Sequence, residues 1–219
     1  MDVANILKKH NAIFVEDDPY AELRFIGEYL PSIRAYLEDN VILLGSFSKI
    51  ITPGLRLGWV CAKKDIMERI IVAKQASDLH SNYLSQRIVH QYLIDNDIDE
   101  HILKIRDAYK KRRDLMVSMI AENFPEEIKY TKPEGGMFLW ITLPEGFSSL
   151  DLFDLAIKEN VAFVLGNAFY VDRDGNNTLR LNFSNSDEER IEEGIKRLAN
   201  IIFLSKTQEV KIEGGREEK

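Results

Sequence analysis

The hydrophobic positions in the first part of the chain form short continuous runs, at residues 12–15, 41–44 and 57–62. Loops and segments with helical spacing separate the runs. Unbroken apolar runs of this length are typical of strands that helices cover on both faces, so we expect a mostly parallel α/β sheet. Three strands are few for such a sheet, and the chain is therefore expected to start partway through a domain.

The middle of the chain has the polar and apolar spacing of helices. Residues 65–93 predict helical structure with a break at residues 78–82, where Asp, His, Ser and Asn cluster. A longer amphipathic helix is predicted from about residue 99 to residues 123–125. The acidic stretch between these helices, residues 95–100, predicts a solvated connection.

The last part of the chain predicts a small α+β unit with a closing helix. A hairpin around a glycine pair, a helix and two strands are expected over residues 128–143, 149–159, 161–165 and 178–183. The closing helix is predicted to begin with a capping box, formed by Ser186 and Glu189. It is expected to bury Ile191, Ile195, Leu198 and Ile202.

These patterns divide the chain into three parts. Residues 1–96 form the α/β region, residues 97–204 form the α+β region, and residues 205–219 are expected to be a frayed polar tail.

Composition excludes several classes of partner. The net charge of -7 argues against binding to nucleic acid or to an anionic membrane, because phosphate binding needs concentrated positive charge. One basic run, residues 110–113, lies in the long helical pattern and is expected to be a solvated face. The single Cys61 allows no internal disulfide, and no apolar run is long enough to span a membrane. We therefore expect a cytoplasmic protein. The histidines are too irregularly spaced to predict a metal site.

The second apolar run is followed by candidate chemistry in the segment GSFSKIITPGLRLG. A partly desolvated lysine such as Lys49, at the end of a buried strand, can serve as an amine for Schiff-base chemistry. Ser46 and Ser48 can donate to phosphate oxygens, and Arg56 offers a planar fork that matches a phosphate. The set predicts a cofactor with an aldehyde and a phosphate. The alternative is that Lys49 is an ordinary loop lysine, because Ser-x-Ser-Lys arises readily by chance.

A second polar cluster, EDDPY, follows the first apolar run at residues 16–20. Ligand sites in open α/β sheets gather at the carboxyl ends of strands, so the two clusters are expected to lie near each other. A carboxylate can keep a pyridine nitrogen protonated, and a phenol can hydrogen-bond a ring hydroxyl. The alternative is an acidic turn with Tyr20 packed beside it.

Together these motifs resemble the class I and II aminotransferases, which are pyridoxal-phosphate (PLP) enzymes of fold type I. The similarity is strongest to the branch with 2-aminoadipate and kynurenine aminotransferases, and to aminotransferase-like domains of transcriptional regulators. The motifs that carry it are Asp17-x-x-Tyr20, Ser46-x-Ser48-Lys49 and Gly54-Leu-Arg56-x-Gly58. The resemblance extends to about Leu204 and covers only the C-terminal portion of such an enzyme.

The resemblance implies roles for individual residues around the cofactor. Lys49 would form the internal aldimine and shuttle the proton, and Asp17 would pair with the pyridinium nitrogen. Tyr20 would contact the phenolic oxygen of PLP. The phosphate would be bound by Ser46, Ser48 and Arg56.

In the α+β region the resemblance implies a substrate contact. Arg180 in the strand pattern TLRLNFS would bind the substrate α-carboxylate. An exposed strand arginine with no such role is the alternative. The turn Gly166–Phe169 resembles a Pro-Gly-x-x-Phe turn of the family, with Leu165 where proline is usual. Residues 1–96 would then be the C-terminal part of the PLP-binding large domain, and residues 97–204 the small domain.

The function expected from this resemblance is PLP-dependent amino transfer from an amino acid to a 2-oxo acid. A homodimer is expected for the full-length protein, and the chain given is expected to be truncated and incomplete for catalysis. Three alternatives stay open: an effector-sensing domain of a transcriptional regulator, a PLP-dependent lyase or decarboxylase, and a non-catalytic structural fragment.

Overall fold

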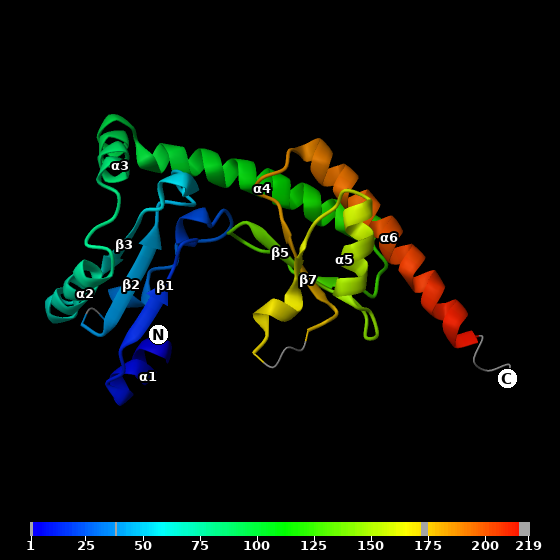
Figure 1. Ribbon diagram of the computed structural model, residues 1–219, viewed down its shortest axis with the longest axis horizontal. Coiled ribbons are helices and arrows are strands. Elements are labelled where there is room, and N and C mark those ends of the chain that lie inside the picture. The colour runs from blue at the N-terminus through cyan, green and yellow to red at the C-terminus, as the bar shows by residue number, and fades with distance from the viewer. Residues whose placement is uncertain (1, 38, 172–174, 215–219) are drawn as a thin grey trace. The chain divides into compact units, whose positions relative to one another are not determined.

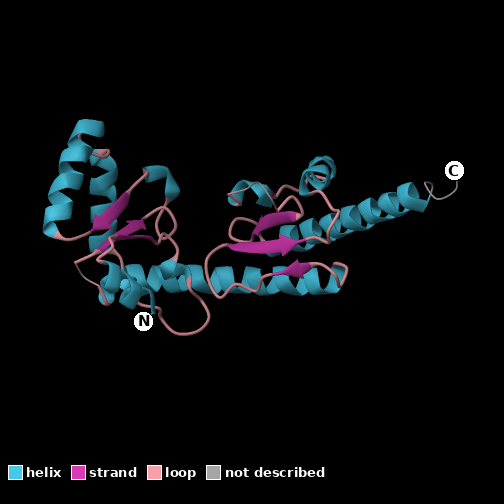
Figure 2. Cartoon of the chain, turned by 90° about the horizontal axis from the view of Figure 1, so that it is seen from below, coloured by secondary structure: helices cyan, strands magenta, loops and turns pink. Residues whose placement is uncertain are grey.

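The chain forms two compact units, each with its own sheet, and its predicted α/β class is confirmed (Figure 1, Figure 2). This computed structural model describes residues 2–37, 39–171 and 175–214. The first unit is Met1–Arg106 and the second is Asp107–Lys219, so the division falls inside helix α4 (Ile98–Asn123).

The first unit contains a three-stranded sheet in the order β1-β2-β3. The predicted strands are present as β1 (Phe14–Asp17), β2 (Val41–Ser46) and β3 (Gly58–Cys61). β1 runs parallel to β2, whereas β3 is antiparallel to it. The parallel register pairs Asp17 with Leu44, so the carboxyl ends of β1 and β2 lie at one edge of the sheet.

Helix α1 (Asp2–His10) covers part of this sheet through a small apolar core. The core is formed by Ala4, Leu37 and Val41, with Leu7, Phe14 and Ile33 packed against it. Helices α2 (Lys64–Ser77) and α3 (Tyr83–Asp95) follow β3, and the predicted break between them is confirmed. α2 buries no side chain, and Val15 and Trp59 on the strands are exposed. The expectation of strands buried on both faces is therefore wrong for the described unit.

The second unit contains an antiparallel sheet in the order β4-β5-β7-β6. Its strands are β4 (Lys129–Tyr130), β5 (Phe138–Thr142), β6 (Val164–Leu165) and β7 (Thr178–Asn182). One face carries the buried residues Leu139, Ile141, Leu179 and Leu181. The strand alternation therefore places the intervening residues, including Arg180, on the opposite face.

The core of this unit is completed by α5 (Ser149–Lys158), α6 (Glu188–Gly214) and the second half of α4, which contributes the buried Met116, Met119 and Ile120. The apolar positions predicted for the closing helix are confirmed as buried. Its cap differs from the prediction, because Asp187, and not Ser186, accepts a hydrogen bond from the backbone N–H of Arg190 at 2.9 Å. α6 also continues through residues 205–214, which the sequence assigned to a polar tail.

The basic run at residues 110–113 is only partly the solvated face that the sequence predicted. Lys110 and Lys111 are exposed, but Arg113 is buried and pairs with Asp114 at 3.1 Å. Arg112 donates to the backbone carbonyl of Ser184 at 2.7 Å. Consecutive helix positions point in different directions, so one run supplies both solvated and packed cations. Within residues 2–37, 39–171 and 175–214, no helix has the length and apolarity needed to cross a membrane.

The turn between β2 and β3 offers a matched pair of glycine substitutions. A Cβ at Gly58 would lie 2.7 Å from the backbone carbonyl oxygen of Gly45, whereas a Cβ at Gly54 would meet nothing within 4 Å. We expect Gly58→Ala to lower the free energy of unfolding by about 1–3 kcal/mol, because backbone must shift. Gly54→Ala should change it by less than about 0.5 kcal/mol.

Urea denaturation followed by tryptophan fluorescence measures this difference. Trp59 lies in the first unit and Trp140 in the second. Each glycine variant therefore also carries Trp140→Phe, so that the fluorescence change comes from Trp59 and reports on the first unit. Equal stabilities of the two glycine variants would contradict the close approach of Gly45 and Gly58.

Candidate functional site

Two connections of the first unit meet at the edge where β1 and β2 end, the loop after β1 and the turn that joins β2 to β3. Asp17 is the last residue of β1, and the following N–H, of Asp18, still donates to the carbonyl of Leu44 at 3.1 Å. Ser46 ends β2 and pairs with Gly58, the first residue of β3. The register therefore gathers the segments that precede and follow these strands at one edge of the sheet.

Two of the three acidic residues at the end of β1 stabilise local structure. Glu16 accepts hydrogen bonds from the Ser32 hydroxyl at 2.5 Å and from the backbone N–H of Ile33 at 3.2 Å. Asp18 accepts from the backbone N–H groups of Tyr20 and Ala21, at 3.3 Å and 2.8 Å. These bonds satisfy backbone N–H groups at the start of the short 3₁₀ helices η2 (Ile33–Ala35) and η1 (Ala21–Leu23), whose N-cap residues are Ser32 and Tyr20.

Asp17 is the carboxylate that this arrangement leaves available. Its side chain is exposed and makes no hydrogen bond or ion pair with the residues that the structure describes. The sequence pattern alone could not identify which of the three acids binds a cofactor, because each could equally well accept hydrogen bonds from local backbone N–H groups. The resemblance to the family selected Asp17, and its proposed role stays a prediction.

Lys49 lies in the turn after β2, next to Tyr20. Its Nζ is 6.0 Å from the centroid of the Tyr20 ring, and both side chains are half-buried. The contact is at the outer limit of a cation–π interaction and stabilises the pair by at most about 1 kcal/mol. Over the described part of the chain the amine has no hydrogen bond and no ion pair. The structure therefore brings together two residues that are predicted to act on one cofactor.

The loop that carries Tyr20 is anchored by a residue that the sequence reasoning missed. Arg106 Nε donates to the backbone carbonyl of Glu22 at 2.6 Å, and its guanidinium pairs with the Glu22 carboxylate at 3.1 Å. Leu23, next in the loop, is fully buried. Arg106 is 84 residues away from Glu22 in the sequence, so no local pattern could have found the contact.

The predicted phosphate ligands lie on the turns around β2 and β3. The Ser46 hydroxyl accepts from the backbone N–H of Ser48 at 3.1 Å. Arg56 is exposed and ends the 3₁₀ helix η3 (Pro53–Leu55) with φ of 53°, in the left-handed region. This conformation is strained for a residue with a Cβ. Strain of this kind persists where a neighbouring requirement, such as ligand binding, maintains it.

Arg180 in the second unit has an aromatic environment. Its Cζ lies 3.9 Å from the Phe138 ring centroid and 4.6 Å from that of Phe169. Its Nε is buried without a hydrogen-bond partner, and among the described side chains no acid pairs with it. Phe138 and Phe169 were missed as site residues, because the sequence shows strand alternation but not which ring lies over a cation.

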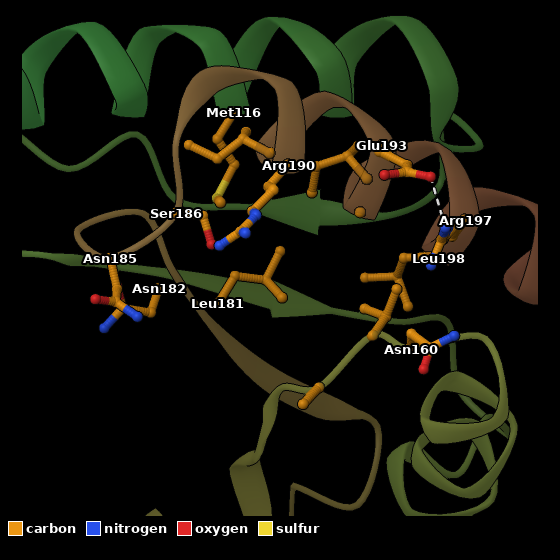
Figure 3. Close-up of a pocket in the computed structure, with 15 residues that line it drawn as sticks. Met116, Asn160, Leu181, Asn182, Asn185, Ser186, Arg190, Glu193, Arg197 and Leu198 are labelled. Carbon is orange, nitrogen blue, oxygen red and sulfur yellow. Dashed lines mark hydrogen bonds and ion pairs between the residues drawn. The ribbon is translucent and has the colours of Figure 1, made fainter.

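A cavity of about 570 Å³ in the second unit lies beside α6, away from this chemistry (Figure 3). Arg190 lies beside Ser186 in it, and Glu193 pairs with Arg197 at 2.5 Å. The walls are otherwise mostly apolar or amide side chains. No residue of the predicted site lines this cavity, so its volume does not locate the reactive groups.

The sequence profile of "Aminotransferase class I and II" matches residues 1–198. The chain belongs to this family. Aromatic-amino-acid aminotransferase 1 of Thermococcus litoralis is 46% identical to this chain over 198 residues, which are 90% of the chain and 48% of the relative. The 2-aminoadipate transaminase of Thermus thermophilus is 38% identical, over 90% of the chain and 50% of the relative. The chain thus spans about half the length of these curated relatives.

Solved structures agree with the family assignment. The kynurenine aminotransferase of Pyrococcus horikoshii, solved in complex with PMP, has a TM-score of 0.87 and 45% identity, over 93% of this chain and 51% of that one. The expected similarity to the 2-aminoadipate and kynurenine aminotransferase branch is confirmed. The regulator YdfD of Bacillus subtilis is 32% identical over 86% of the chain and 39% of its own length, so the family also extends to regulators.

The two adjacent acids at the end of β1 give a test of their different roles. Asp18→Ala removes the acceptor of two backbone N–H groups and should lower the free energy of unfolding by about 1 kcal/mol. Asp17→Asn breaks no described bond and should change it by less than about 0.5 kcal/mol. Thermal unfolding followed by circular dichroism compares the two variants. A loss of stability in Asp17→Asn as large as in Asp18→Ala would show that Asp17 is also structural.

Proposed function

We propose that this chain serves PLP-dependent amino transfer from an amino acid to a 2-oxo acid. One observation carries the proposal: Lys49 has no hydrogen bond or ion pair within the described residues and lies 6.0 Å from the Tyr20 ring. The position of Lys49 after β2, at the edge where β1 presents Asp17, favours the functional interpretation.

The residues at this edge fit PLP as a donor set. They offer an amine for its aldehyde, a carboxylate for its ring nitrogen, a phenol for its ring hydroxyl, and hydroxyl and guanidinium groups for its phosphate. Among the described residues the Arg56 side chain donates only to the carbonyl of Pro53, at 3.2 Å, so it keeps further donors for an anion. When bound, PLP supplies an electron-withdrawing ring conjugated with its aldehyde carbon.

Lys49 and Asp17 have the proposed proton roles. Lys49 Nζ would take a proton from the substrate Cα and return it to the carbon of the PLP aldehyde group. Asp17 accepts a hydrogen bond from the protonated ring nitrogen and stabilises its positive charge. Asp17 has no partner in the part of the chain that the structure describes, so both carboxylate oxygens are available for this contact.

The remaining residues bind and orient. Tyr20 donates to the oxygen on the cofactor ring, while the phosphate is held by Ser46, Ser48 and Arg56. Arg180 binds the substrate α-carboxylate with its planar fork. We propose that a homodimer of the full-length protein holds the complete site, with amino acids and 2-oxo acids as substrates.

A sensor function is the second candidate. The similarity to the regulator YdfD supports it, because a domain of this family can belong to a regulator. Such a domain would keep the cofactor-binding residues and respond to an effector without turnover. Release of a 2-oxo acid from an amino acid, measured with the full-length protein, distinguishes the enzyme from the sensor.

Reductive trapping tests the proposed role of Lys49. The full-length protein is incubated with PLP, reduced with borohydride and mapped by peptide mass spectrometry. We expect Lys49 to be modified before other lysines, since the neighbouring ligands hold the aldehyde beside its amine. Lys49→Arg should abolish this labelling, whereas Lys63→Arg, at an exposed lysine 3.9 Å from Asp39, should leave it intact. Labelling distributed evenly over the surface lysines would contradict the proposal.

Arg56 gives a prediction in which stability and binding change in opposite directions. Arg56→Gly relieves the strain of the left-handed conformation and should raise the free energy of unfolding by up to about 1 kcal/mol. It also removes a proposed phosphate ligand, so trapping at Lys49 should need more PLP. Arg56→Lys keeps the strain and the charge but lacks the planar fork, and should weaken trapping without the gain in stability. Urea denaturation and PLP titration of both variants measure the two effects separately.

A further inference from the structure

Arg180 lies against two aromatic rings, whereas the usual partner of an arginine in a protein is an acid. It lies on β7 opposite Trp140 of β5 and Val164 of β6. Phe138 is two residues before Trp140 on the same face of β5, and is therefore a diagonal neighbour of Arg180. Phe169 comes from η4 (Gly166–Phe169), directly after β6. Two separate segments thus bring a ring to one guanidinium.

The distances place the charge against the faces of both rings. Arg180 Cζ is 3.9 Å from the Phe138 centroid and 4.6 Å from the Phe169 centroid, which is well within the range of cation–π attraction. Trp140 packs edge-on against Phe169, with ring centroids 5.6 Å apart and an interplanar angle of 80°. Phe169 is half-exposed, so few side chains hold its ring. The edge-on contact with Trp140 is one that fixes the orientation of the ring.

Rings and acids have different consequences for binding. A carboxylate partner would neutralise Arg180 and occupy the N–H groups that a ligand carboxylate needs. A ring attracts the charge through its π face and uses none of those donors. In the structure the guanidinium lies against both rings, its buried Nε has no hydrogen-bond partner among the described residues, and no described acid pairs with it.

We propose that Phe138 and Phe169 are positioning residues for Arg180, which they preorganise for the α-carboxylate of the substrate. This inference rests on the proposed function and extends it to two residues with no assigned role. Ordering a long arginine side chain costs conformational entropy. The two rings order it before the ligand arrives, so less of that cost remains at binding.

NMR of the arginine side chain tests the arrangement directly. Stacking against rings shifts the Arg180 Hε resonance upfield, and burial slows its exchange with water. Phe169→Leu and Phe138→Leu should each move this resonance toward the position of free arginine. The resonance that disappears in Arg180→Lys is thereby assigned to Arg180. Phe153→Leu is the control, since Phe153 packs against Phe163, with centroids 5.4 Å apart, and not against Arg180.

Titration with propionate measures the consequence for binding. Propionate has the carboxylate but no amine, so it cannot react with a cofactor, and propionamide is its uncharged counterpart. We expect propionate, but not propionamide, to shift the Arg180 resonance. Each Phe→Leu variant should bind propionate roughly threefold to tenfold more weakly. Phe169→Tyr keeps a ring and should bind like the unaltered chain, as should the Phe153→Leu control.

The outcomes separate the two proposals. Equal propionate affinity in the unaltered chain and in both Leu variants would overturn the positioning role, as would a failure of the unaltered chain to bind propionate. Borohydride trapping at Lys49 uses neither propionate nor Arg180, so its failure counts against the proposed function alone. Phe169 is half-exposed, and the circular dichroism spectrum verifies that its variants are folded.

Discussion

The parallel pairing of β1 with β2 is the constraint on which the candidate site depends. It aligns Asp17 with Leu44 and so brings the carboxyl ends of both strands to one edge of the sheet. The loops that leave this edge carry Tyr20 and Lys49, and their side chains meet although the residues are far apart in the sequence. A shift of one residue in this register would turn each side chain of one strand to the other face.

The same units keep their proposed functional charges free of competing partners. At the end of β1, Glu16 and Asp18 accept hydrogen bonds from backbone N–H groups, whereas Asp17 makes no hydrogen bond or ion pair with the described residues. In the second unit, Arg180 lies against two rings and no described acid pairs with it. An unpaired charge costs stability where it is partly buried, and a site that binds a charged ligand recovers this cost on binding.

The backbone around β2 and β3 also restricts which residues can occupy the candidate site. Gly58 passes so close to Gly45 that only glycine fits without movement, and Arg56 adopts a left-handed conformation that glycine would tolerate better. A glycine is therefore present where packing requires it, whereas an arginine is present where packing would favour glycine. The second case agrees with the anion-binding role proposed for Arg56, because strained backbone persists where function requires it.

The sequence by itself determined the elements, the α/β class and the family. Apolar runs and helical spacing are local properties, so they located β1, β2, β3 and the long helices, and the Lys49 motif indicated the chemistry. The tertiary structure decided which cap begins α6, which part of the basic run is buried, and which residues support the site. Arg106, Phe138 and Phe169 act through contacts between segments distant in the sequence or through the direction of a ring. Periodicity specifies the face on which a side chain lies, but the partner that it meets there depends on how the strands and loops pack.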